Sequence, residues 1–350
     1  MLVIIDASLL KDFATRIFIA AGVREEHAAV IADSLVFAEL RGTSSHGVAR
    51  IPIYVKRIKK GLIDVNANPH IVKDGIATAL IDARNGIGQV VGLHAMQLAI
   101  QKAKAVGIGS VVVRNSNHYG AAAYFSLMAV EAGMIGFTTT NANPTMAPWG
   151  SSTAFFGTNP ISVAIPCSPR PIVLDMATST VARGKIILAA RKGLKIPLGW
   201  GLTKTGKPTQ DPNEALQGTL APLGGAKGSA LAMVVDVLSG VLSGGLFGRD
   251  IGALYTEFER PQGVGHFFQA LPVECFGSLE EFIARMSRMA GEIKALEKAE
   301  GFEEIFLPGE IEARCQEERL RDGIPLDEVT VHELMEVALE LGVDARMLAA

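Results

Sequence analysis

Apolar residues recur at helical spacing through the first sixty residues of the chain. This spacing predicts three helices, over residues 7–21, 24–39 and 48–60. Asp6 stands where an N-cap is expected, and Gly22 follows the first helix as a C-terminal glycine does. Between the second and third helices lies a polar, glycine-flanked turn, residues 41–47, and such turns often carry functional side chains.

From about residue 72 onward, the pattern changes to short apolar runs that alternate with helical segments. This alternation is typical of an α/β core, in which helices connect and cover the strands of a sheet. The predicted strands are residues 77–82, 109–115, 134–141, 160–166 and 171–177, and the predicted helices between them are residues 92–106 and 121–132.

Three more helices are predicted in the second half of the chain. Residues 228–244 form an apolar segment, which indicates a buried helix. Residues 278–300 have the pattern of a charged amphipathic helix, and residues 331–341 that of a last short one. No internal repeat, low-complexity tract or linker-like boundary interrupts the sequence, so we expect any domains to interweave.

The composition is that of a globular enzyme. The 350 residues suffice for one large domain or two modest ones, and the balance of 49% hydrophobic and 20% charged residues argues against a disordered chain. A net charge of −3 leaves no basic stripe for nucleic acid and no polybasic patch for a membrane. Three scattered cysteines indicate a reduced compartment. With no signal-peptide pattern and no apolar run of ~18–20 residues, a cytoplasmic protein is expected.

Several common catalytic motifs are absent. The glycines of Gly86-Ile-Gly88-Gln-Val-Val-Gly92 suggest a dinucleotide fingerprint, but the spacing differs by one residue and the expected acid after the next strand is missing. A glycine-rich turn that lets a helix pack closely is the better interpretation. The chain has no GxSxG elbow, and His332 is not followed by a second histidine at zinc-binding spacing. Ser45 and His46, as sequence neighbours, are not expected to face each other as a protease pair does.

Two histidine turns remain as candidates for catalysis. The first is Ser44-Ser45-His46-Gly47-Val-Ala-Arg50, and the second is Arg114-Asn-Ser-Asn117-His118-Tyr119-Gly120. The second turn leads from a predicted strand into a predicted helix, which is where α/β proteins bind ligands. Imidazole can transfer a proton near neutral pH, and a guanidinium can bind a carboxylate through two hydrogen bonds.

At these residues the sequence resembles the type-2 malate/L-lactate dehydrogenases, a family that also includes sulfolactate and ureidoglycolate dehydrogenases and some cyclic-imine carboxylate reductases. The resemblance extends over nearly the whole chain. Its markers are RGTSSHGVARIPIY (41–54), NGIGQVVG (85–92), SNHYGAAAY (116–124), FGTNPISVAIP (156–166), LDMATSTVARGK (174–185), IPLGWGLTKTGKPTQDP (196–212), GGAKGSALAMVVDVLSGVLSG (224–244) and LPGEIE (307–312).

The resemblance implies an α/β fold of the sulfolactate dehydrogenase-like type, which binds NAD(P) but is not a Rossmann fold, with helical N- and C-terminal parts. Residues 1–70 and 310–350 are then expected to form a helical substrate and dimer region. Residues 71–309 would form the α/β NAD(P)-binding and catalytic region, interwoven with it. The family also implies a homodimer, NAD or NADP as cofactor, and no metal.

The resemblance further implies that a 2-hydroxy or 2-oxo acid lies between His46 and His118, one of which exchanges a proton with the C2 oxygen. Arg50 would hold the substrate carboxylate and Ser45 would orient His46, which we favour as the proton shuttle. Further substrate contacts are implied for Thr158, Arg183 and Gly184. Cofactor contacts are implied for His118, Tyr119, Gly120, Ala121, Ala122, Asp175, Met176, Ala177, Lys227, Gly228, Leu307, Pro308, Gly309 and Glu310.

Two of the implied cofactor contacts have a physical reason. Asp175 ends a predicted strand and could accept the ribose hydroxyls, and Lys227 opens an apolar helix, where its charge and the helix amides could act on a phosphate. The chain departs from many relatives at Thr203, where they carry Asp, and at His266, where they carry an amide. The exact acid, the choice between NAD and NADP, and reduction of a cyclic imine as an alternative activity stay open.

Overall fold

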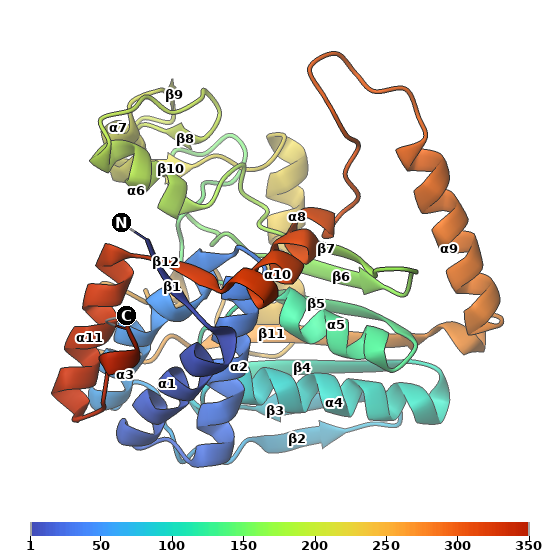
Figure 1. Ribbon diagram of the computed structural model, residues 1–350, viewed down its shortest axis with the longest axis horizontal. Helices are drawn as coiled ribbons and strands as arrows, with labels where there is room; N and C mark the ends of the chain where they lie inside the picture. Colours follow the sequence, from blue (N-terminus) through green and yellow to red (C-terminus); the bar gives the residue numbers. More distant parts are fainter. Residues whose placement is uncertain (1, 349–350) are drawn as a thin grey trace.

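The computed structural model describes residues 2–348 and consists of a central sheet with helices grouped around it (Figure 1). The helices are α1 (Ala7–Ala20), α2 (Glu25–Leu40), α3 (Ile51–Lys59), α4 (Gly88–Val106), α5 (Ala123–Glu131), α6 (Arg183–Arg191), α7 (Pro212–Gln217), α8 (Ala226–Asp236), α9 (Leu279–Lys294), α10 (Glu310–Asp322) and α11 (Glu328–Leu341). None of the described helices is long and apolar enough to cross a membrane.

Seven strands form the central sheet in the order β2-β3-β4-β11-β5-β6-β7. They are β2 (His70–Asp74), β3 (Thr78–Asp82), β4 (Gly109–Ser116), β5 (Met134–Thr140), β6 (Ile161–Ile165), β7 (Ile172–Met176) and β11 (Val264–Pro272). Only β3 and β4, which α4 connects, are paired in parallel, and the other neighbours are antiparallel. The predicted alternation therefore gives a mixed α/β sheet. It is mainly antiparallel because β2–β3, β5–β6 and β6–β7 pair as antiparallel neighbours, and because β11, which the sequence pattern did not predict, inserts antiparallel between β4 and β5.

Helices α4 and α5 cover one face of this sheet at close range. A Cβ atom on Gly109 of β4 would lie 1.9 Å from the carbonyl oxygen of Ala99 in α4, and one on Gly136 of β5 would lie 2.1 Å from that of Ser126 in α5. Side chains from both helices, β4 and β11 form one buried cluster, which includes Phe125 and Phe268. Because the sheet and these two helices pack so closely, the turn that leads from β4 to α5 is held in a fixed position.

The two ends of the chain pack together beside the sheet. Strand β1 (Leu2–Ile5) pairs antiparallel with β12 (Ile324–Asp327), and α1, α2, α3 and α11 share a second hydrophobic core. A small three-stranded sheet, formed by β8 (Gly201–Leu202), β9 (Pro208–Thr209) and β10 (Thr219–Leu220), lies with α6 and α7 at another edge of the molecule (Figure 1). Helix α9 projects at the far side in the same view and has no buried residue.

One predicted element differs from the structure in a way that matters for function. Residues 228–244 were expected to be a single buried helix, but α8 ends at Asp236 and a π-helical turn follows over Val237–Val241. Only one side of this segment is buried, through residues such as Ala232 and Val235. The prediction of a buried helix is wrong, because several apolar side chains of the segment are exposed: Leu231, Met233, Val234, Val237, Val241 and Leu242.

A buried histidine joins three segments at the centre of the sheet. His266 at the start of β11 is fully buried, and its ring nitrogens contact the hydroxyls of Thr140 at 2.8 Å and Ser116 at 2.9 Å. The Tyr119 ring stacks on the His266 ring with 4.6 Å between centroids and 1° between planes. Burial lowers the pKa of His266 to about 3, so the ring is neutral near pH 7. His266 thus supplies two hydrogen bonds and a stacking surface at the centre of the sheet.

A second buried polar group anchors the turn that follows α2. The Glu39 side chain is 1% exposed, and one carboxylate oxygen accepts from the Ser44 hydroxyl at 2.7 Å while the other accepts from the Val48 amide at 3.0 Å. Gly47 lies directly against it, since a Cβ there would be 2.0 Å from the Glu39 oxygen. Burial raises the pKa of Glu39. A single carboxylate therefore holds both sides of the turn that carries His46.

We expect Gly47→Ala to destabilise the fold by about 1–3 kcal/mol, because the added methyl group must displace the Glu39 carboxylate from a site with no spare room. Thermal unfolding would measure the loss. Gly291→Ala in α9 is the matched control: a Cβ there meets no other group within 4 Å, and alanine favours helix formation. An unchanged melting temperature for Gly47→Ala would contradict the role given to the Glu39 contact.

Candidate active site

The first histidine turn folds as two short 3₁₀ segments, Ser44–His46 and Val48–Arg50. In this tight turn the Ser45 hydroxyl lies 3.1 Å from His46 Nδ1, so the expectation that these neighbours do not face each other is wrong. Arg50 closes the turn from the other side, because its Nε donates to the Ser45 carbonyl oxygen at 2.6 Å. The Arg50 guanidinium also contacts the Tyr255 hydroxyl and lies over the Tyr255 ring at 5.2 Å. Arg50 is thus fixed in orientation.

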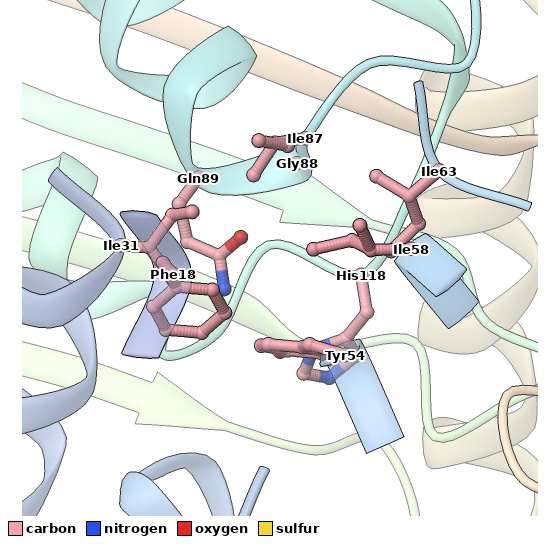
Figure 2. A pocket seen from close by; sticks show the side chains of 9 residues that line it. All are labelled: Phe18, Ile31, Tyr54, Ile58, Ile63, Ile87, Gly88, Gln89 and His118. Atoms are coloured by element: carbon pink, nitrogen blue, oxygen red, sulfur yellow. The ribbon is translucent and has the colours of Figure 1, made fainter. Parts of the chain in front are cut away.

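The second histidine turn lies directly against the first. The His46 and His118 rings are stacked, with 5.5 Å between centroids and 20° between planes. The Tyr54 hydroxyl lies 2.6 Å from His118 Nδ1, and the backbone amide of His118 donates to Gln262 Oε1 at 3.1 Å. Figure 2 shows the Tyr54 and His118 side chains side by side, below the start of α4. The structure therefore brings His118 together with His46 and Arg50, which belong to a turn far from it in the sequence.

The start of α4 explains the glycine-rich segment that resembled a dinucleotide fingerprint. A Cβ on Gly88 would lie 2.3 Å from the Asn117 carbonyl oxygen and 2.4 Å from that of His118. Gly92 packs against the Phe125 ring, where a Cβ would lie 2.7 Å from the nearest ring atom. These glycines allow the helix to touch the second histidine turn, in agreement with their interpretation as close-packing residues.

Both histidines lie in surroundings that disfavour a positive charge. Burial, and then the Arg50 charge, lower the pKa of His46 to about 3. The pKa of His118 is lowered well below its usual value by burial and then by the Arg50 charge. Without substrate, both rings are neutral near pH 7, the state in which imidazole can accept a proton.

A loop over residues 253–260 forms one wall of the site and is held by a buried arginine. Arg57 of α3 has no exposed surface, and its Nη atoms donate to the carbonyl oxygens of Ala253, Leu254, Glu257 and Arg260, at 3.4, 3.2, 2.8 and 3.3 Å. The loop carries Tyr255, which contacts Arg50. Helix α3 thus positions both Tyr54 and the loop, through side chains one helical turn apart.

A second region gathers residues implied to bind the cofactor. Asp175 near the end of β7 accepts from the Ala123 amide at 2.8 Å, so its carboxylate lies at the start of α5, beside the turn of Tyr119 to Ala122. The residue keeps an exposed face, yet the protein packed around its carboxyl raises its pKa to about 6, although Arg41 acts in the opposite direction. The Leu307–Glu310 stretch lies along the same strand, since the Val173 amide donates to the Pro308 carbonyl oxygen at 3.0 Å.

Two other implied cofactor residues lie next to this region. Met176 and Ala177 lead from β7 to Thr178, whose carbonyl oxygen accepts from the Leu223 amide at 2.9 Å. Lys227 and Gly228 follow in the first turn of α8, and a Cβ on Gly228 would lie 2.8 Å from the Thr178 carbonyl oxygen. Lys227 is exposed, whereas Glu310 is bound to Lys294 at 2.6 Å and so serves as an ion-pair partner in this structure.

Within the part of the chain that the structure describes, the remaining residues that the resemblance implies for substrate binding have no hydrogen bond to the two histidine turns. Thr158 lies beside the end of β7, where its carbonyl oxygen accepts from Thr178 at 2.8 Å. Arg183 starts α6 and donates to the Leu216 carbonyl oxygen at 3.2 Å, and Gly184 is exposed beside it. Arg183 and Gly184 therefore lie with α6 beside the small three-stranded sheet, and the hydrogen bond of Arg183 to Leu216 does not connect them with the two histidines.

Several residues of the site were not singled out from the sequence. Tyr54 follows Arg50 by four residues, a spacing that places both near one face of α3, and this signal could have identified it. Arg57 and Tyr255 gave no comparable signal, because their roles depend on contacts with distant segments, and Glu39 gave none because its role depends on its burial within a turn. Among the described residues, no group of three or more His, Cys, Asp and Glu side chains could hold a metal ion.

The chain is similar over nearly its full length to proteins of known family. The family model described as malate/L-lactate dehydrogenase matches residues 5–335. A malate dehydrogenase of Pyrococcus abyssi is 44% identical over 95% of this chain and 94% of its own length. An L-sulfolactate dehydrogenase of Methanocaldococcus jannaschii is 45% identical over 92% of this chain and 93% of its own. The solved structure of sulfolactate dehydrogenase from the latter organism matches 99% of both chains with a TM-score of 0.93 at 42% identity.

The names of two further relatives mention a cofactor. A ureidoglycolate dehydrogenase of Escherichia coli is named with NAD(+), and a (2R)-3-sulfolactate dehydrogenase of Chromohalobacter salexigens with NADP(+). The family match spans most of the chain, and the identity to relatives extends over almost its full length. This chain therefore belongs to the malate/L-lactate dehydrogenase family.

Proposed function

We propose that this protein is an NAD(P)-dependent oxidoreductase that interconverts a small L-2-hydroxy acid, of the malate, lactate or sulfolactate type, and its 2-oxo acid. The observation that carries this proposal is the group formed by His46, His118 and Arg50, in which two stacked imidazoles lie beside one guanidinium. A substrate carboxylate held by Arg50 would place its adjacent C2 oxygen within reach of the imidazoles. Relatives named for malate and sulfolactate support this substrate class.

In the proposed mechanism, Arg50 binds the substrate carboxylate and His46, oriented by Ser45, takes the hydroxyl proton of the 2-hydroxy acid. Two features favour His46 as the acceptor: its pKa of about 3 in the free site keeps it neutral, and Ser45 fixes its ring. When bound, the nicotinamide supplies the acceptor for the hydride that leaves C2. His118 then contacts the C2 oxygen. In the reverse direction, protonated His46 returns its proton to that oxygen.

The second region fits a dinucleotide. Asp175 has a carboxylate at the edge of β7 that could accept ribose hydroxyls, and Lys227 lies in the first turn of α8 with Gly228, where a phosphate would meet both a positive charge and helix amides. Gly309 has no Cβ, which would otherwise lie 2.7 Å from Val173, so the Leu307–Glu310 stretch can lie against β7. We propose that these residues hold NAD or NADP.

The exposed apolar side chains of α8 and the following π-helical turn support the homodimer implied by the family resemblance. Contiguous apolar surface of this kind commonly forms an interface. We propose that this face, which includes Met233, Val234 and Leu242, contacts a second copy of the chain. The division into a helical region, residues 1–70 and 310–350, and an NAD(P)-binding region, residues 71–309, also stays a proposal.

The activity is tested by following absorbance at 340 nm with NADH or NADPH and a panel of 2-oxo acids, and with NAD or NADP and the corresponding hydroxy acids. Malate, lactate, sulfolactate and ureidoglycolate cover the hydroxy acids named for the family. A cyclic imine carboxylate tests the alternative, reduction of a C=N bond in the same pocket. Turnover of the cyclic imine alone would replace the proposed function, and no turnover with any pair would contradict both.

We expect Arg50→Lys to raise the KM for the 2-oxo acid about 10- to 150-fold and to leave NADH binding nearly unchanged. Loss of a charge-assisted two-point contact costs about 1.5–3 kcal/mol, since an ammonium cannot replace the planar guanidinium. Steady-state kinetics with varied substrate, combined with NADH titration, measures both effects. Arg170→Lys, which alters an exposed arginine paired with Glu317, is the control. An unchanged KM in Arg50→Lys would exclude the carboxylate role.

Lys227→Ala should weaken NADH binding more than substrate binding, and added salt should reduce the difference from the wild type. The exposed ammonium would act on a phosphate mainly through charge, which salt screens. Fluorescence titration with NADH at low and high salt measures the effect, with Lys192→Ala, another exposed lysine, as control. Equal affinities for Lys227→Ala and wild type would show that Lys227 is a surface residue without a role in binding.

His46→Ala and His118→Ala should differ in kind. Loss of the proton shuttle lowers kcat about 10²- to 10⁴-fold and abolishes the acidic limb of the pH profile, whereas loss of a positioning group leaves the limb in place.

In the wild type, hydroxy-acid oxidation requires neutral His46, so activity falls as the pH drops below the pKa of His46. A substrate carboxylate on Arg50 offsets the charge that lowers this pKa, so the kcat limb should lie at higher pH than the kcat/KM limb. If only His118→Ala loses the limb, the two roles are exchanged.

A further inference from the structure

The contacts of His118 Nδ1 determine which of its ring nitrogens carries the proton. The Gly120 amide donates to Nδ1 at 3.3 Å, and because a backbone N–H can only donate, Nδ1 acts as the acceptor in this contact. The Tyr54 hydroxyl lies 2.6 Å from the same nitrogen and must then also donate to it. A neutral imidazole whose Nδ1 accepts carries its proton on Nε2.

The backbone of the turn makes this arrangement possible. Gly120 has φ +85°, a left-handed conformation that glycine adopts at little cost. This conformation lets the Gly120 amide reach back to the ring two residues before it. A Cβ at Gly120 would in addition lie 3.0 Å from the Ser34 hydroxyl, so the position favours glycine for two reasons. The weaker of the two Nδ1 contacts is therefore built into the turn itself.

Tyr54 is held as a donor by its surroundings. Its side chain is 4% exposed, and burial raises the pKa of the Tyr54 hydroxyl above its ordinary value, so the hydroxyl keeps its proton. A small cavity behind Tyr54 and His118 is lined mostly by apolar side chains, with Gln89 of α4 as the other polar group (Figure 2). Apolar walls behind the ring disfavour an imidazolium, which would also bring an Nδ1–H against the Gly120 N–H.

We propose that Tyr54 fixes His118 in the tautomer that carries its proton on Nε2, so that His118 holds the C2 oxygen as a hydrogen-bond donor and leaves proton transfer to His46. This inference rests on the proposed function for the identity of the oxygen, but the tautomer itself does not depend on it. Tyr54 is then a positioning residue that acts through His118. The two imidazoles differ in function because only His118 has an Nδ1 that accepts from two donors, the Tyr54 hydroxyl and the Gly120 amide.

The bonding changes balance with this division. In oxidation, the C2–H bond breaks and its electron pair leaves with the hydride, which the oxidised cofactor takes up. The O–H proton goes to His46, and the C2–O bond becomes a carbonyl. The His118 Nε2–H hydrogen bond is kept throughout, and it stabilises the partial negative charge on the oxygen during the transfer. His118 therefore gains and loses no proton in the cycle.

The test is ¹⁵N NMR of the whole enzyme labelled at its histidine rings, with the His118 signals assigned by their absence in His118→Gln. For the wild type near pH 7 we expect one nitrogen of the protonated type, at Nε2, and one of the unprotonated type, at Nδ1. Tyr54→Phe should move both signals toward a mixture of tautomers. It should also lower kcat about five- to tenfold, as expected for the loss of one neutral hydrogen bond.

Tyr54→Phe should also raise the pKa of His118, because Nδ1 loses the stronger of the two hydrogen bonds that stabilise its neutral form. The charged and titratable groups that face the ring, Arg50, His46 and His266, are unchanged in this variant, so such a shift reports on the Tyr54 hydroxyl. Tyr124→Phe, which removes a hydroxyl bonded to Asp33 at 2.8 Å, is the matched control and should leave the His118 signals unchanged.

A proton on Nδ1 of wild-type His118, or an imidazolium near pH 7, would overturn the proposal, and so would a Tyr54→Phe variant with unchanged His118 signals. The wild-type spectrum decides the tautomer even if Tyr54→Phe does not fold. Absence of turnover with every 2-hydroxy acid would contradict the proposed function without changing this spectrum, so the two failures can be distinguished.

Discussion

His266 at the start of β11 bonds to hydroxyls on both neighbouring strands, Ser116 of β4 and Thr140 of β5, and stacks on Tyr119. These contacts fix the register of a strand that comes from about 130 residues later in the chain than β5. Because β11 occupies this place, the turn after β4 and the loop before β11 meet at one end of the sheet. The amide of His118 and the side chain of Gln262 make that junction directly.

The two histidines of the site are supported by different parts of the molecule. His118 depends on the central sheet, through its neighbour Tyr119 and through the start of α4. His46 depends on the helical layer, where the buried Glu39 carboxylate holds the turn from within. Arg319 of α10 donates to the Glu39 carbonyl oxygen, so the segment that follows the Leu307–Glu310 stretch also supports the His46 turn. The site therefore exists only where these two layers meet.

Much of the local structure could be predicted from the sequence, because periodic apolar spacing depends on nearby residues. The helices near the N-terminus, the Asp6 cap and the strands β3 to β7 agree with the pattern to within a few residues. Strand β11 was missed because Gly265 and His266 interrupt its apolar run. The prediction that α8 is buried was wrong, because an apolar composition does not reveal which face of a helix packs against another element. His46, Arg50 and His118 carried sequence signals, whereas Glu39, Tyr255 and Arg57 act through contacts between segments more than a hundred residues apart or through a buried turn.

Arg57 binds four carbonyl oxygens of the 253–260 loop and no side chain of that loop takes part in those four bonds. The loop is therefore held by its backbone, which every residue type possesses. Exposed side chains of the loop, such as Tyr255 over Arg50, can change without loosening these four bonds. Such a construction separates variation on the exposed surface of the loop from the attachment that Arg57 provides. A lineage could change Tyr255 and its exposed neighbours while Arg57 and the two histidines stay as they are.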